Sequence, residues 1–154
     1  MLGFLKRKKT YGPFVYLTEP TFLYHTKTEK AILEIIEEKL NSNNILVPSK
    51  YGIRDTSNRI REAQYLVAVA PLGKFTSLVG REVKLAQELG VKIFTLVIAR
   101  KENELVYLWT EGIPEEVEWL SPEETLEFTK TFINSEFMDY LKHGLFIGSR
   151  KREW

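Results

Sequence analysis

The 154 residues suffice for one domain with a single hydrophobic core, and 44% hydrophobic with 28% charged residues is typical of a soluble globular protein. Lysine plus arginine (22) nearly balance aspartate plus glutamate (21), so no specific nucleic-acid binding is predicted. The absence of cysteine excludes disulfides, thiolate metal sites and cysteine nucleophiles, and two histidines do not suggest a metal cluster. We expect no metal and no cofactor.

The N-terminus, residues 1–12, has a short apolar tip followed by a basic run. The apolar part is too short for a membrane span or a signal-peptide core. We therefore expect a frayed basic end, no membrane span and a cytoplasmic location, with weak attachment to an anionic surface as the alternative. Lysine and glutamate are plentiful while Asp55 and Asp139 are the only aspartates, a bias found in hyperthermophile proteins.

Strands and helices alternate along the first half of the chain. Residues 14–17 form a short apolar run that stops before Pro20, as a first strand would. Thr26 and Glu29 fit a capping box, which predicts a helix that extends to Leu40. Residues 45–47 predict a second strand, and Asp55 or Thr56 could cap a second helix. A ligand contact is the alternative role for Asp55.

Two nearly continuous apolar runs follow, at residues 65–70 and 91–99. Such runs are typical of strands that are covered on both faces in a parallel sheet. A helix over residues 77–90 lies between them. The strand, helix and strand together predict a right-handed crossover unit.

The C-terminal third is less regular. Residues 104–110 predict an added strand or hairpin arm, and residues 117–120 a short final strand of the main sheet. Ser121 followed by proline and two glutamates predicts a helix start, and residues 137–154 form a C-terminal extension. Three tryptophans in this region indicate either core packing or a homo-oligomer interface. We expect one α/β domain over residues 1–154.

Glu82 is the most informative residue of the chain because it falls within the apolar face of the 77–90 helix. At about 100° of rotation per residue, this face is formed by Leu78, Val79, Val83, Leu85, Ala86 and Leu89. A carboxylate turned toward a core must be paired, hydrogen-bonded, protonated or open to a cleft. Glu82 is therefore a candidate catalytic residue, or else a partly buried carboxylate that is held by Arg81, Lys74 or a neighbouring loop amide, or satisfied at a subunit contact.

The predicted fold is flavodoxin-like: a three-layer domain with a mostly parallel sheet of strand order 2-1-3-4-5. Ligands of such sheets collect where the strand order reverses, here between the first and third strands. Glu19 from one loop and Ser77 from the other would line this crevice, although exposure to solvent is usual for a residue placed like Glu19 at a strand end. Carboxylates beside a cleft are suited to nucleophilic and acid–base work on acetal-like carbons.

The order and spacing of several short segments resemble those of nucleoside 2-deoxyribosyltransferases. The resemblance runs from about Phe14 to Ala99, and its motifs are short. They are Val15-Tyr-Leu-Thr-Glu-Pro20, a later strand ending at Pro48, Ile60-Arg-Glu-Ala-Gln64 and Gly80-Arg-Glu-Val-Lys-Leu-Ala86.

This resemblance implies N-glycosidic bond cleavage or transfer on a nucleoside or nucleotide by a homo-oligomer. Glu82 matches the nucleophilic glutamate of that family, which forms a glycosyl-enzyme intermediate, and Tyr16 matches its first-strand aromatic residue. Together with Glu19 and Ser77 from the crevice and with Asp55, Tyr16 is a predicted substrate-binding residue. Ser77 followed by Glu82 is also similar to TIR domains, whose enzymatic members cleave NAD at a glycosidic bond.

The sequence also allows a function without catalysis. The chain has Thr18 and Glu19 where the deoxyribosyltransferase family usually has Ala-Gly, Gln64 where an aspartate is expected, and Thr76-Ser-Leu-Val79 in place of Asp-Ser-Gly-Thr. The alternative function is a nucleotide-binding or protein-interaction domain of the same fold.

Overall fold

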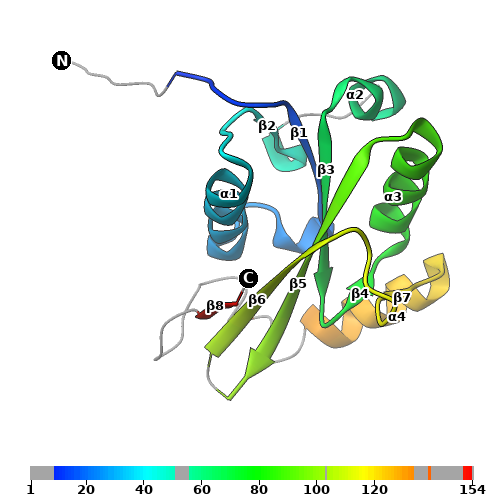
Figure 1. The fold of residues 1–154 in the computed structure, drawn as a ribbon. Helices are drawn as coiled ribbons and strands as arrows, with labels where there is room; N and C mark the ends of the chain where they lie inside the picture. The colour runs from blue at the N-terminus through cyan, green and yellow to red at the C-terminus, as the bar shows by residue number, and fades with distance from the viewer. Residues whose placement is uncertain (1–8, 51–55, 103, 134–138, 140–150, 154) are drawn as a thin grey trace.

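The computed structural model describes residues 9–50, 56–102, 104–133, 139 and 151–153 (Figure 1). Asp55 and most of the predicted N-terminal end and C-terminal extension lie outside these residues. The described chain is α/β, with a six-stranded sheet between helices on both faces. In spatial order the strands are β2 (Ile45–Leu46), β1 (Val15–Thr18), β3 (Tyr65–Pro71), β5 (Lys92–Lys101), β6 (Glu104–Glu111) and β8 (Lys151–Glu153).

The first four strands in this order run parallel to one another, which confirms the predicted flavodoxin-like class. β6 lies antiparallel to β5, with Leu96 paired to Trp109, so the segment predicted as an added strand or hairpin arm is a hairpin arm. The order reverses between β1 and β3, as predicted, because β2 lies on the far side of β1.

Alternation along β1 and β3 divides the apolar interior into two layers. Val15 and Leu17 join the cluster that packs against α1 (Lys27–Leu40), whereas Tyr16 joins the cluster formed with α2 (Thr56–Glu62) and α3 (Ser77–Leu89). Figure 1 shows α1 on one face of the sheet and α2 and α3 on the other. The period-two pattern of a strand thus decides which side chains can reach α3.

The ends of α1 and α3 follow from local chemistry. The Thr26 hydroxyl accepts a hydrogen bond of 3.2 Å from the Glu29 amide at the start of α1, and Asn41 ends that helix in the left-handed conformation. Gly90 ends α3 in the same conformation. Two short 3-10 turns, η1 (Thr21–Leu23) and η2 (Pro48–Lys50), follow β1 and β2.

The prediction that residues 117–120 form the last strand of the main sheet is wrong. β7 (Glu118–Trp119) pairs in parallel with β4 (Lys74–Phe75) in a separate two-stranded sheet. The antiparallel hairpin arm β6 occupies the place beside β5 instead. Trp119 packs edge-on against Phe75, with ring centroids 5.1 Å apart, so this aromatic residue serves packing within the chain.

The last described helix, α4 (Pro122–Ile133), begins with the predicted capping box. The Ser121 hydroxyl accepts from the Glu124 amide at 3.0 Å, and the Glu124 carboxylate accepts from the Ser121 amide at 2.8 Å. Phe132 stacks on Phe22 of η1 with centroids 4.8 Å apart. Figure 1 shows α4 near the carboxyl ends of β1 and β3, so it packs at the edge where the crevice was predicted.

Candidate functional site

Glu82 lies on the side of α3 that faces the sheet, as its position in the apolar stripe predicts. Only 8% of its surface is exposed, and Val79, Val83 and Ala86 on the same helix are fully buried. The amphipathic pattern of α3 therefore forces this carboxylate inward, where it needs hydrogen-bond donors.

Tyr16 supplies a donor. Its hydroxyl donates a hydrogen bond of 2.9 Å to Oε2 of Glu82, and the tyrosine side chain is completely buried. Two residues separated by 66 positions thus meet where β1 approaches α3. The sequence placed both in one site, and the structure brings them into direct contact.

Burial is the main cause that raises the pKa of Glu82 above its ordinary value of 4.5. Thr18, Tyr16 and the positive charge of Arg81 act in the opposite direction and lower this pKa. The Thr18 hydroxyl is near enough to stabilise the carboxylate, although it makes no hydrogen bond within the usual geometric limits among the described residues. Burial followed by the charge of Glu82 raises the pKa of Tyr16, which keeps its hydroxyl protonated and available as a donor.

Glu82 also opens onto a pocket of about 440 Å³, which we call the Glu82 pocket. Its lining comes from the start of α2 and from α3: Thr56, Leu78, Arg81, Glu82, Lys84, Leu85 and Glu88. Glu82 is thus one of the lining residues, although only 8% of its surface is exposed. Arg81 and Lys84 add two positive charges to the walls.

The other predicted substrate-binding residues are placed differently. Ser77 is the first residue of α3, and its amide donates a hydrogen bond of 2.8 Å to the Thr125 hydroxyl of α4. That amide is thus already satisfied by the chain itself. Asp55 lies outside the described residues, and its neighbour Thr56 lines the Glu82 pocket. The binding roles of Ser77 and Asp55 stay predictions.

Glu19 is only 1% exposed, so the expectation of a solvent-exposed strand-end charge is wrong. Burial, together with the neighbouring Glu29 carboxylate, raises the pKa of Glu19 to about 10. The pKa of Glu29 is lowered. Burial is the largest single effect and raises this pKa, but the hydrogen bonds with Glu19, Ser49 and the His25 amide together outweigh it. Sequence reasoning missed Glu29, because its place in a capping box already accounted for it.

Tyr24 is a second residue that the sequence did not suggest. Burial, and then the charges of Glu19, Glu82 and Glu29, raise its pKa to about 12. Since three glutamates act on one phenol, the Tyr16–Glu82 contact and the Glu19–Glu29 pair belong to the same region of the protein. It lies around the carboxyl end of β1.

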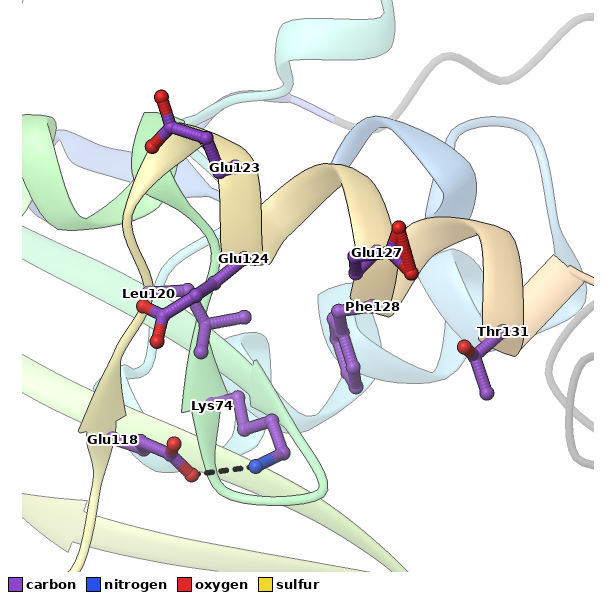
Figure 2. A pocket seen from close by; sticks show the side chains of 8 residues that line it. All are labelled: Lys74, Glu118, Leu120, Glu123, Glu124, Glu127, Phe128 and Thr131. Atoms are coloured by element: carbon purple, nitrogen blue, oxygen red, sulfur yellow. Dashed lines mark hydrogen bonds and ion pairs between the residues drawn. The ribbon is translucent and has the colours of Figure 1, made fainter.

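A second groove, of about 470 Å³, lies between α4 and the β4–β7 sheet (Figure 2). Figure 2 shows one cation, Lys74, paired with Glu118, and three further glutamates from α4, which are Glu123, Glu124 and Glu127. Glu124 already serves the helix cap. This surplus of negative charge disfavours an anionic ligand, so the Glu82 pocket is the better candidate site for a nucleotide.

Within the described residues, no group of three or more histidine, cysteine, aspartate or glutamate side chains is arranged to hold a metal ion. None of the helices in that part of the chain has the length and apolar character needed to span a bilayer. Comparison of the chain with protein-family models, with curated proteins and with solved structures found no match in any of the three.

Proposed function

We propose that this protein cleaves or transfers the N-glycosidic bond of a nucleoside or nucleotide, with Glu82 as the nucleophile. The observation that carries the proposal is the buried Tyr16–Glu82 hydrogen bond at the wall of an open pocket. A hydrogen-bonded carboxylate in an apolar wall is held in one orientation and is poorly solvated, which favours attack on an electron-deficient carbon.

In the proposed reaction, an oxygen of the Glu82 carboxylate attacks the anomeric carbon of the sugar. The carbon–nitrogen bond breaks, and its electron pair leaves with the base, which takes up a proton from solvent. Water or a second base then attacks the same carbon and releases Glu82. The carboxylate thereby divides one difficult displacement into two easier steps through an oxocarbenium-like transition state.

The volume and the lining of the Glu82 pocket are compatible with a nucleoside or nucleotide. Its volume of about 440 Å³ falls within the range of roughly 300–1,000 Å³ that is usual for small-molecule sites. Leu78 and Leu85 offer apolar surface, whereas Arg81 and Lys84 offer charges for a phosphate group. The same walls suit NAD, whose cleavage would follow the same first step.

Binding without turnover is a second candidate function. The upward shift of the Glu82 pKa by burial points in this direction, because it disfavours the ionised form that a nucleophile needs. The binding function and the enzymatic function differ in what they predict. A ligand that binds only the folded protein raises its melting temperature even when no base is released.

The test is a screen for free base after incubation of the purified protein with nucleosides, nucleotides and NAD. We expect release from at least one compound, loss of release in Glu82→Gln, and retention in Glu34→Gln, since Glu34 is exposed on α1, on the other face of the sheet. Equal release by the wild type and Glu82→Gln contradicts the role of Glu82. Thermal stabilisation without release supports the binding function.

A further inference from the structure

Two glutamates meet in the interior where β1 ends and α1 begins. Glu19 is 1% exposed and Glu29 is 5% exposed, so neither carboxyl group is hydrated from bulk solvent. Glu19 follows the last residue of β1, and Glu29 lies in the first turn of α1. Two acidic groups are thus buried together at one junction of the fold.

The described residues do not supply enough hydrogen-bond donors for both glutamates to be ionised carboxylates. Oε1 of Glu29 accepts from the His25 amide at 3.2 Å. Both oxygens of Glu19 and Oε2 of Glu29 are buried without such a partner. A buried ionised carboxylate without donors is strongly unfavourable, and a second carboxylate beside it adds repulsion.

The neighbouring groups cannot neutralise two negative charges. Ser49 of η2 and His25, in the segment before α1, act on Glu29, and the charges of both glutamates act on Tyr24 at the end of η1. In the described part of the chain, burial and Glu29 are the influences on Glu19, and no cation offsets them. A single proton between the two carboxyl groups removes one charge and supplies the missing donor.

We propose that Glu19 and Glu29 share one proton in the folded protein, and that this acid–carboxylate pair is an alkali-sensitive clamp between the end of β1 and the first turn of α1. Glu19 carries the proton and donates it in a hydrogen bond to ionised Glu29. The shifts in pKa agree in direction, since that of Glu19 is raised and that of Glu29 is lowered. Glu19 directly follows Thr18, which acts on Glu82, so the clamp lies next to the candidate site.

The clamp gives stability a defined dependence on pH. Glu19 has a pKa near 4.5 when unfolded and about 10 when folded, so the folded state binds one more proton across this window. Stability from this group is complete below the unfolded pKa and is lost as pH rises through the window. The equilibrium constant for folding then falls by up to about tenfold per pH unit. This inference does not depend on whether the protein is an enzyme.

Urea unfolding between pH 6 and 9 tests the clamp with three variants. Glu19→Gln keeps a hydrogen-bond donor toward Glu29 but has no titrating proton, so we expect a folded protein that has lost most of the pH dependence of the wild type. Glu29→Gln removes the ionised partner, so the dependence should shrink. Glu34→Gln, at an exposed position of α1, should retain it. Equal pH slopes in the wild type and Glu19→Gln overturn the proposal.

Infrared spectroscopy of the native protein provides a second test, which does not rely on Glu19→Gln folding. We expect the carbonyl band of a protonated carboxylic acid to persist at pH 8. It should also persist in Glu82→Gln, which excludes Glu82 as its source. Absence of this band in the folded Glu82→Gln protein at pH 8 overturns the proposal.

Discussion

The hydroxyl of Tyr16 donates a hydrogen bond of 2.9 Å to Oε2 of Glu82 and thereby joins β1 to α3 across the switch point of the sheet. Both residues are buried, so water does not compete for this bond. The contact fixes the orientation of the one acidic side chain that α3 turns toward the sheet. It also lowers the pKa of that side chain, against the larger upward effect of burial.

Replacing Tyr16 by phenylalanine removes the donor and leaves the aromatic ring. Hydrogen bonds to charged groups contribute about 1.5–3 kcal/mol, so we expect the free energy of unfolding to fall by an amount in this range. Chemical denaturation at neutral pH measures it. Tyr65→Phe on the neighbouring strand β3 is the control, because the Tyr65 ring packs on Phe94, and a change well below that of Tyr16→Phe is expected.

Tyr16→Phe should also shift the pH profile of the enzymatic activity. Glu82 must be ionised to act as a nucleophile, and its pKa is already raised by burial, so the acidic limb of the profile should lie above 4.5. Tyr16 lowers this pKa, and its loss should shift the limb further upward. A limb that stays in place in Tyr16→Phe would show that another group controls it.

Gly12 adopts a positive φ of 86°, and a Cβ at this position would lie 2.5 Å from the Asn41 carbonyl oxygen. Gly12→Ala therefore combines backbone strain with a clash against backbone atoms that cannot easily move. We expect a loss of stability clearly above the roughly 1 kcal/mol that an unfavourable φ alone costs. Gly73→Ala is the matched control, since Gly73 also has a positive φ but has open space around it. Equal losses would exclude the clash.

The Thr125 hydroxyl accepts the Ser77 amide at the first turn of α3, although the two residues are 48 positions apart. Thr125→Val keeps the shape and removes the acceptor, which leaves a helix-terminal amide unsatisfied. We expect a loss of about 1 kcal/mol, typical of a lost helix cap, in thermal or urea unfolding. Thr131→Val, at an exposed position of α4, should change stability by less than about 0.5 kcal/mol.

Phe132 attaches α4 to the rest of the protein. It is 3% exposed and stacks on Phe22, whereas the adjacent Ile133 is 53% exposed. Truncating a buried phenylalanine typically costs about 3–5 kcal/mol, so Phe132→Ala should be strongly destabilising and Ile133→Ala nearly neutral. Similar effects of the two substitutions on the unfolding free energy would contradict the packing of α4.

Local patterns in the sequence predicted much of the fold. The apolar runs before and after α3 became β3 and β5, and Thr26 and Ser121 mark helix starts, because each signal depends on residues close in the chain. The position of residues 117–120 could not be predicted in this way. Their partner is β4, 44 residues away in register, and two-residue strands carry no periodicity.

The candidate site was predictable to a similar extent. Glu82 stands out because a helical wheel shows its direction, and its burial is confirmed. The environment of Glu19 could not be predicted, because it depends on how α1 docks against the end of β1. One signal was present: a glutamate directly after an apolar strand, with another in the first turn of the next helix. The capping box accounts for Glu29 within its own helix and does not indicate that its carboxylate accepts from the His25 amide and interacts with Glu19.

The most direct test of the central claim is the mass of the intact protein after acid quenching of a reaction with the nucleoside or nucleotide that releases most base. We predict a species heavier by one sugar unit, with the adduct located on Glu82 by peptide mapping and missing from Glu82→Gln. Base release accompanied by an adduct on another residue, or undiminished base release by Glu82→Gln, would contradict the assignment of Glu82 as the nucleophile.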